Sequence, residues 1–243
     1  MHARTIGREP EYRAIRAELA SVHSANKPRD IADDVRRMFA ETANQVDIQV
    51  DEAFYAALSS IERKMRAPGP FYAFSHGDPC PDNWLCDGET TKLIDYEFAG
   101  YKHALLDGVY GHIMFPTCWC VGLIPEALVA EMEDIYRKEL MQGCAEAADD
   151  ATFQEELFAA CAYWTWHTLR GLLKSALEER HTWGIASTRA RIVSRLAALL
   201  AMAERNKSSQ YPLLVAVSQR LYALVSALWS EEKLQLYPCF QEK

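Results

Sequence analysis

Apolar positions recur with helical spacing through the first third of the chain. They fall three and four residues apart, which places them on one side of a helix. Pro28 and the run from Pro68 to Pro70 separate these stretches, because helices rarely continue through a proline. The pattern predicts three helices with the apolar faces Tyr12, Ile15, Leu19 and Val22; Ile31, Val35, Met38 and Phe39; and Phe54, Leu58, Ile61 and Met65.

The same period returns in the second half of the chain. Pro125 near a first turn and Gly143 beyond a last one predict a helix through Glu133 and Leu140. The stretch from Thr152 to Glu155 predicts a capping box at the start of a longer helix that is rich in aromatic residues. Two further helices are expected on either side of residues 206–212, with apolar positions at Ile192, Leu196, Leu199 and Leu200 and at Leu214, Val217, Leu221, Leu224, Val225 and Leu228.

Between these helical regions the pattern changes to two short strands. Asn83–Cys86 and Thr91–Ile94 are short apolar runs, and the Asp-Gly stretch between them is a strong turn signal. A hairpin whose turn is centred near Glu89 makes Asn83 and Asp95 approximate cross-strand partners, and facing side chains start roughly 5 Å apart at Cβ. Two oxygen-bearing side chains could then share one cation.

Length and composition indicate one domain with a single core. The chain has 243 residues, of which 49% are hydrophobic, and this is enough to bury a sizeable core. We expect a mostly α fold with a small β part, in the α+β class. The formal charge of −8 argues against general nucleic-acid binding and is compatible with a cationic small-molecule partner.

Nothing in the sequence indicates a membrane protein. The N-terminus has no charged segment followed by an apolar core. The longest apolar stretch, residues 196–203, is much too short to cross a bilayer. We therefore expect a cytoplasmic protein with no membrane partner.

The cysteines and histidines are candidates for disulfides, metal binding or catalysis, but their spacing in the sequence does not support these roles. Seven cysteines, without Cys-x-x-Cys pairs, predict free thiols and not a disulfide framework. Cys118-Trp119-Cys120 has metal-ligand residue types but too few visible neighbours, so we interpret both cysteines as buried thiols. The aromatic residues of the helix after Thr152 are interpreted as core, and His167 and His181 as core or helix-end histidines.

Three polar residues stand in the order that phosphoryl transfer from ATP requires. In that chemistry one carboxylate orients the acceptor hydroxyl, while an amide oxygen and a second carboxylate hold the magnesium that bridges the phosphates. Asp78 can fill the first role, and Asn83 and Asp95 the second. So small a ligand set suits Mg²⁺, which keeps phosphate and water oxygens in its coordination shell. Alternatively, Asp, Asn, Pro and Gly are common turn residues, and His76 to Asn83 would then be a surface connection.

The spacing of His76, Asp78 and Asn83, with Gly77 in the middle position, matches the His-x-Asp-x-x-x-x-Asn pattern of kinase catalytic loops. Together with Ile94-Asp95-Tyr96-Glu97 it resembles the motif pair of the aminoglycoside phosphotransferase and choline kinase superfamily, whose fold is similar to that of the protein kinases. The resemblance implies that Asp78 is the catalytic base or acceptor-orienting residue and that His76 braces the catalytic loop. It implies that Asn83 and Asp95 are the magnesium ligands. Through Mg²⁺ the same two residues would bind ATP or GTP.

The resemblance extends to neighbouring residues. Asp107 matches a downstream Asp that supports the catalytic loop and helix packing. Glu97 lies near the metal, either as a ligand or one layer further out. The segment Leu19–His23 looks like the early helix of the large lobe of this family.

The expected architecture is therefore a protein-kinase-like large C-terminal lobe in which a small β-hairpin carries the catalytic and metal residues. We expect one domain over residues 1–243, with a helical lead-in over 1–70, the catalytic loop and metal-binding hairpin over 71–112, and a helical acceptor-side subdomain over 113–243. The aromatic helix in that last part could form an acceptor pocket, since aromatic rings attract cations.

The lobe that covers ATP is expected to be missing. A kinase needs a glycine-rich loop and a strand-borne Lys paired with a helical Glu. Residues 1–75 contain only Gly7 and Gly69 as glycines and only Lys27 and Lys64 as lysines. A segment encoded upstream is therefore a possible partner.

Three functions follow from these observations. The first is an ATP-dependent, magnesium-assisted O-phosphotransferase acting on a hydroxyl of a small molecule, with the acceptor and the choice between ATP and GTP left open. The second is a catalytically inactive kinase-like lobe that serves as a binding or interaction module. The third is an unrelated helical protein in which the turn motif is coincidental.

Overall fold

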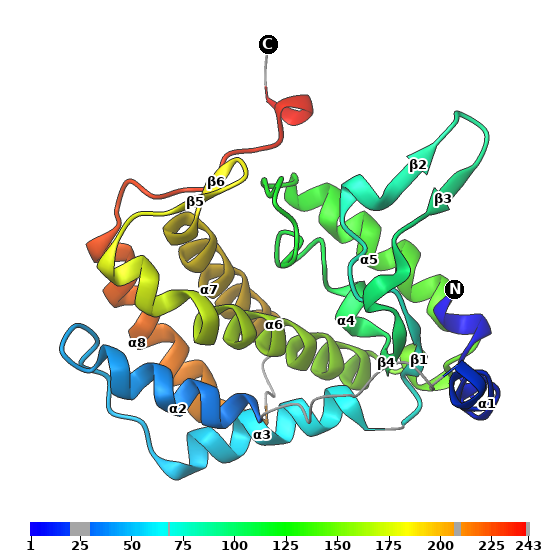
Figure 1. Ribbon diagram of the computed structural model, residues 1–243, viewed down its shortest axis with the longest axis horizontal. Helices are drawn as coiled ribbons and strands as arrows, with labels where there is room; N and C mark the ends of the chain where they lie inside the picture. The colour runs from blue at the N-terminus through cyan, green and yellow to red at the C-terminus, as the bar shows by residue number, and fades with distance from the viewer. Residues whose placement is uncertain (20–29, 68, 207–209, 242–243) are drawn as a thin grey trace.

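The computed structural model describes residues 1–19, 30–67, 69–206 and 210–241. It is mostly helical, and the longest helix, α6 (Asp150–Glu178), packs against α2, α3, α4 and α7 (Figure 1). The other helices are α1 (Glu9–Leu19), α2 (Ile31–Thr42), α3 (Glu52–Arg66), α4 (Leu105–Gly108), α5 (Glu126–Leu140), α7 (Thr188–Arg205) and α8 (Pro212–Leu228). None of the helices in these ranges is long and apolar enough to span a membrane.

Three small antiparallel sheets accompany the helices within the described residues, so the mostly α, α+β class is confirmed. The predicted hairpin is formed by β2 (Trp84–Cys86) and β3 (Thr91–Leu93), and it projects from the helical body (Figure 1). Two pairs were not predicted: β1 (Tyr72–Ser75) with β4 (Gly100–His103), and β5 (Thr182–Trp183) with β6 (Ala186–Ser187). The first of these joins residues that flank the whole catalytic segment, so no local turn signal announces it.

The core forms where α2 and α3 pack on α6. The predicted apolar faces of α2 and α3 are buried, with the exposed fraction of every one of their apolar residues below a tenth. Trp166 of α6 is fully buried, with its ring 6.1 Å from that of Phe39 and 5.0 Å from that of Phe54. The interpretation of the aromatic helix as core is therefore correct for Trp166, and equally for the fully buried Phe158.

The apolar face predicted for the first helix is wrong. Ile15 of α1 is 58% exposed, and Tyr12 is the residue that packs inward, against the rings of Phe74 and Tyr101. Ile15 is exposed because α1 lies at the edge of the β1–β4 pair and contacts this pair through one aromatic side chain. Val22, Pro28, the remainder of the expected early helix from residue 20 to 23, Pro68 and residues 207–209 lie outside the described residues.

The start of α6 also differs from the prediction. The N-cap is Asp149, whose carboxylate accepts a hydrogen bond from the backbone N–H of Thr152 at 2.8 Å. Thr152 is therefore inside the first turn and does not cap the helix. An Asp cap uses the same chemistry as the predicted Thr-x-x-Glu box, one turn earlier.

Candidate active site

The chain turns sharply at Gly77, directly after β1. Its φ of +84° lies in the left-handed region, and a Cβ placed there would lie 2.6 Å from the carbonyl oxygen of Phe98. Both the backbone conformation and the close approach require glycine. This turn directs Asp78 away from the strand.

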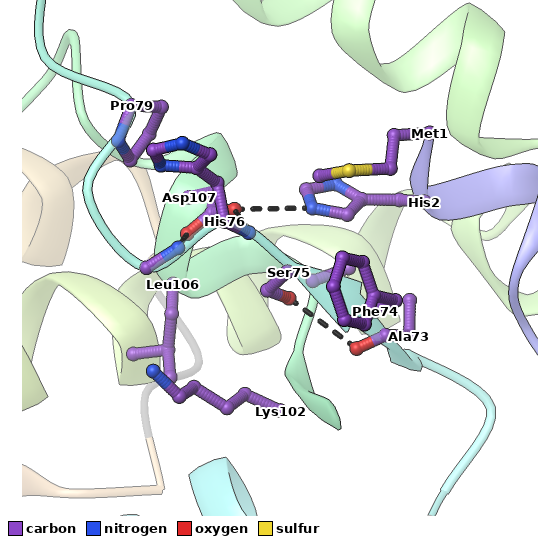
Figure 2. A network of polar contacts seen from close by, with 12 residues as sticks. Met1, His2, Ala73, Phe74, Ser75, His76, Pro79, Lys102, Leu106 and Asp107 are labelled. Atoms are coloured by element: carbon purple, nitrogen blue, oxygen red, sulfur yellow. Dashed lines mark hydrogen bonds and ion pairs between the residues drawn. The ribbon is translucent and has the colours of Figure 1, made fainter. Parts of the chain in front are cut away.

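Asp107 of α4 holds the start of the loop. Its buried carboxylate accepts hydrogen bonds from the backbone N–H of His76 at 2.7 Å and from that of Gly77 at 3.0 Å. The ring of His2 reaches the same carboxylate at 3.2 Å (Figure 2). The supporting role expected for Asp107 is confirmed. The contribution of His2 was not predicted, because nothing in the sequence links the first residues to the loop.

His76 joins the loop to the strand that precedes Asp95. Its Nδ1 accepts a hydrogen bond from the N–H of Asp78 at 3.2 Å, and its Nε2–H donates to the carbonyl oxygen of Ile94 at 2.8 Å. These two partners require the neutral ring with its proton on Nε2. The ring is fully buried and lies edge-on to Tyr96. His76 therefore braces the loop, as expected.

Asp78 and Asn83 are in direct contact. The Nδ2 of Asn83 donates to the backbone carbonyl of Asp78 at 2.8 Å and to its carboxylate Oδ2 at 3.3 Å. The other carboxylate oxygen, Oδ1, accepts from the hydroxyl of Thr117 and from the thiol of Cys80, the latter at 2.8 Å. Thr117 was missed by the sequence analysis, since it follows the motif by more than thirty residues and carries no spacing signal.

The hairpin register differs by one residue from the predicted one. Trp84 pairs with Leu93, and the N–H of Ile94 donates to the carbonyl of Asn83 at 3.0 Å. Asn83 therefore faces Ile94, and Asp95 comes one residue later. The turn is tighter than predicted because Asp87 caps it. The carboxylate of Asp87 accepts hydrogen bonds from the backbone N–H groups of Glu89 and Thr90.

Asp95 leaves the strand in a left-handed conformation. Its φ of 63° and ψ of 65° are unusual for a residue other than glycine and store of the order of 1–3 kcal/mol of strain. Its exposed carboxylate accepts no hydrogen bond from any described residue and does not cap the short 3-10 helix Tyr96–Phe98. Such strain persists where the surrounding structure imposes it, and it turns Asp95 out of the hairpin.

Asn83 and Asp95 offer the oxygen atoms that a magnesium ion needs. The Nδ2 of Asn83 is engaged by Asp78, which leaves its Oδ1 as the free end of the amide, and among the described residues no donor reaches it. Amide and carboxylate oxygens are suitable Mg²⁺ ligands. Glu97 is exposed on the adjacent 3-10 helix. The residues present therefore fit the ion, although their roles as ligands stay a prediction.

Aromatic residues support the loop from behind. Tyr110 donates its hydroxyl to the carbonyl of Gly77 at 3.0 Å, and burial raises the pKa of this hydroxyl. Trp164 of α6 packs edge-on against Tyr110 and donates its Nε1–H to the carbonyl of Leu106 at 2.8 Å. The central helix thus fixes both the catalytic loop and α4.

Two buried arginines of α7 hold the segment that carries Thr117. Arg195 donates to the carbonyl of Pro116 at 2.9 Å, and Arg191 donates to that of Cys118 at 2.7 Å. Burial lowers the pKa of Arg195 to about 9. Neither residue was predicted as functional, because arginines on a helix usually face solvent.

The cysteines are all free, as predicted, but three of them gather next to Asp78. The ligand atoms of Cys80, Asp82 and Cys118 lie within 4.8 Å of one another, and the Sγ atoms of Cys118 and Cys120 are 2.9 Å apart. The neighbouring Cys80 thiol lowers the pKa of Cys118 to about 7, and the proximity of Cys118 raises the pKa of Cys80. The expectation that Cys118 and Cys120 lack suitable neighbours is therefore wrong.

The remaining candidates lie apart from this loop. His167 sits within α6 between the rings of Tyr163 and Trp164, and burial, with help from Arg170 and Arg66, lowers its pKa to about 4. His181 follows the end of α6 and is exposed. Both placements agree with core and helix-end interpretations.

A cavity of about 620 Å³ lies beside the loop and the hairpin. Its walls include His2, Pro79, Tyr110 and Tyr136. Asp78, Asn83 and Asp95 do not line it. We therefore do not identify it as the acceptor pocket.

A model of the phosphotransferase enzyme family (APH) matches residues 10–137, just over half of the chain. The chain belongs to this family. The matched segment contains the catalytic loop, the hairpin and α4, and it confirms the family that the motif pair resembles. Members of the phosphotransferase family generally use ATP and Mg²⁺. No curated protein matches the chain.

Proposed function

We propose that the protein transfers the γ-phosphoryl group of ATP, with Mg²⁺, to a hydroxyl of a small molecule. The observation that carries this proposal is the contact between Asn83 and Asp78, with Asp95 directly beyond the strand residue that pairs with Asn83. Membership of the phosphotransferase family supports the reaction class. The acceptor class and the nucleotide come from the resemblance of the motifs.

Asp78 is the acceptor-orienting residue in this proposal. Its Oδ1 is held by Thr117 and Cys80, which fixes the plane of the carboxylate. Among the described residues its Oδ2 has only the longer contact with Asn83, at 3.3 Å, and it is the atom available to accept a hydrogen bond from a substrate hydroxyl. Positioning of this kind is the main contribution of a protein to phosphoryl transfer, because the transition state needs little covalent assistance.

Asn83 Oδ1 and the Asp95 carboxylate would hold the magnesium ion. When bound, the ion neutralises charge on the β- and γ-phosphate oxygens. Asn83 then has two tasks: its oxygen faces the metal and its amide nitrogen fixes Asp78. The left-handed turn at Asp95 serves the same arrangement, because it releases the carboxylate from the strand.

The exposed face beside the site supports a covering partner. Apolar residues of the hairpin and the following turn are exposed: Trp84, Leu85, Ile94, Tyr96 and Phe98. Exposed apolar side chains beside polar ligands are typical of a surface that meets another segment. We propose that an ATP-covering lobe, encoded upstream, packs on this face and supplies the glycine-rich loop and the lysine.

The test is transfer of labelled phosphate from ATP to a panel of acceptors by a chain extended upstream, if the reading frame allows, and by residues 1–243. The panel contains aminoglycosides, choline, ethanolamine and neutral sugars, because the negative net charge is compatible with cationic acceptors. Asp78→Asn should lower turnover at least a hundredfold, whereas Glu89→Gln, at the exposed turn of the hairpin, should leave it unchanged. Equal turnover of Asp78→Asn and wild type would remove Asp78 from its role.

A second candidate function is a kinase-like binding module without catalysis. The same exposed apolar face favours it, since a docking surface needs no chemistry. It predicts that neither chain binds magnesium nucleotide, and that an intact loop makes no difference. Nucleotide binding that depends on Asp95 would exclude this candidate.

A further inference from the structure

Three cysteines and one aspartate meet beside the catalytic loop. Cys80 and Asp82 follow Asp78, whereas Cys118 and Cys120 lie in the segment between α4 and α5. Asp82 and Cys118 are 36 residues apart in sequence, yet one ligand atom from each, and the Sγ of Cys80, all lie within 4.8 Å of one another. The Sγ of Cys120 is 2.9 Å from that of Cys118. The fold therefore brings three metal-ligand groups together, and the thiol of Cys120 lies beside one of them, Cys118.

We propose that this cluster is a structural site for a divalent cation of the zinc class. The ligands are Cys80 Sγ, Cys118 Sγ, Cys120 Sγ and Asp82 Oδ1. Three sulfurs and one oxygen form the four-ligand set of a closed zinc site, and thiolates disfavour Mg²⁺. The site is distinct from the pair Asn83 and Asp95, whose ligands are oxygen only, and it does not rest on the proposed function.

The separations among Cys80, Asp82 and Cys118 are close to those that tetrahedral coordination demands. Zn–S bonds of about 2.3 Å place the sulfurs about 3.8 Å apart. Cys118 Sγ already lies 3.9 Å from Asp82 Oδ1. The Cys118–Cys120 pair has to open by about an ångström, the set of Cys80, Asp82 and Cys118 has to close by about an ångström, and Cys120 has to turn toward Cys80 and Asp82. Side-chain rotation can make adjustments of this size.

Trp119 orients the carboxylate ligand. Its Nε1–H donates to Asp82 Oδ2 at 2.8 Å, so Oδ1 is the oxygen turned toward Cys118. A donor on the second oxygen of a ligating carboxylate is the usual support for such a ligand. Trp119 itself is exposed, so this hydrogen bond, and not burial of the ring, is the contact that the position supplies.

The surroundings are suited to a charged metal–thiolate centre. Three thiolates and a carboxylate exceed the charge of a divalent ion by two, and the buried guanidinium of Arg191 is the nearby counter-charge. It donates to the carbonyls of Cys118 at 2.7 Å and Trp119 at 2.9 Å, which also fixes the backbone of the ligands. The thiols lie in an apolar cluster with Tyr110 and Phe115, which limits access of water.

Binding has a defined consequence for the catalytic loop. Each ligating thiol releases its proton to solvent, so Cys80 no longer donates to Asp78, while the hydroxyl of Thr117 still does. The ion also ties the loop after Asp78 to the segment before α5. Metal binding therefore makes the loop more rigid. The metal-free chain has one more hydrogen bond to Asp78 than the metal-bound chain.

The test is titration of the reduced, metal-depleted chain with Co²⁺, followed by displacement with Zn²⁺. We expect one equivalent of Co²⁺ with thiolate-to-cobalt charge-transfer absorption and the intense d–d bands of tetrahedral cobalt. Zn²⁺ should remove both signals and protect Cys120, the least buried of the three ligand thiols, from alkylation, while the exposed Cys86 stays reactive. Asn83→Ala/Asp95→Ala should leave the tetrahedral spectrum unchanged, which separates this site from the proposed magnesium site.

Variants of the less buried ligands decide the outcome without unfolding the core. Cys120→Ser and Asp82→Ala should each weaken Co²⁺ binding at least tenfold, and Trp119→Phe should weaken it by roughly tenfold because the supporting donor is lost. The control Cys86→Ser, an exposed cysteine of the hairpin, should bind as wild type. Unchanged affinity in Cys120→Ser and Asp82→Ala, an octahedral cobalt spectrum, or no binding by a folded and fully reduced chain would overturn the proposal.

Discussion

The amide nitrogen of Asn83 is hydrogen-bonded to both the backbone carbonyl and the carboxylate of Asp78, at 2.8 Å and 3.3 Å. This pair of contacts orients the amide, so that its oxygen points away from Asp78. One side chain thereby links the acceptor-orienting residue to the proposed metal site.

Substitutions at Asn83 should separate these two tasks. Asn83→Asp keeps an oxygen ligand but replaces the donor with a second carboxylate beside Asp78. We expect it to retain Mn²⁺ binding and to lose about 1–2 kcal/mol of unfolding free energy, because the contacts with Asp78 are lost. Asn83→Ala should lose both. Paramagnetic resonance of Mn²⁺ and urea unfolding measure the two effects, and equal Mn²⁺ affinity in Asn83→Ala and wild type would contradict the assignment.

Asp107→Asn should loosen the catalytic loop. The carboxylate serves the backbone N–H groups of His76 and Gly77 with different oxygens, and the amide can accept with only one of them. A buried N–H left without a partner costs about 1–3 kcal/mol. Urea unfolding should show this loss, with faster hydrogen exchange at one of the two N–H groups. Wild-type exchange at both would show that Asp107 does not hold the loop.

Gly77→Ala should displace Asp78. The Cβ of an alanine at this position would clash with the carbonyl oxygen of Phe98. The alanine would also have to adopt a φ of +84°. We expect a loss of about 1–3 kcal/mol of stability from strain. Gly88→Ala is the matched control, since its φ is also positive, at +95°, but nothing lies within 4 Å of the added methyl group. A loss at Gly77 no greater than that at Gly88 would show that the close approach carries no cost.

Glu133 should make the fold sensitive to acid. Burial raises the pKa of Glu133, but His112, Arg205 and Gln154 outweigh it and lower the pKa to about 2. The resulting stabilisation, at most about 3 kcal/mol, is complete above the unfolded pKa near 4.5 and is lost as pH falls toward 2. Unfolding free energy measured from pH 7 to pH 2 should fall more steeply in wild type than in Glu133→Gln. Parallel curves would rule out this linkage.

The sequence predicted the helices and the hairpin that depend on apolar spacing and on turn residues close in sequence. The apolar faces of α2 and α3 are buried because three- and four-residue spacing faces one core, and the Asp-Gly turn forms the hairpin. Where two local signals competed, the predicted position was wrong by a few residues. Asp149 caps α6 in place of Thr152. Asp87 tightens the hairpin turn, so Asn83 faces Ile94 and not Asp95.

Contacts between distant segments were beyond the sequence. The motif spacing identified Asp78 and Asn83, but the residues that hold this loop come from elsewhere: Thr117, which donates to Asp78, and Tyr110, which donates to Gly77. Exposed Ile15 shows the same limit, because a helical period does not say which helix has a partner. The convergence of Cys80 with Cys118 depends on tertiary packing of loops, for which the sequence has no periodic signal.

The most direct test of the central claim is magnesium-dependent ATP binding, measured by calorimetry on residues 1–243 and on a chain extended upstream. The proposed site predicts binding by at least the extended chain that requires Mg²⁺, is lost in Asp95→Ala and is kept in Glu89→Gln, whose exposed carboxylate lies on the same hairpin. Binding that is unchanged in Asp95→Ala, or no binding by either chain in the presence of Mg²⁺, would contradict the claim that Asn83 and Asp95 form a nucleotide–magnesium site.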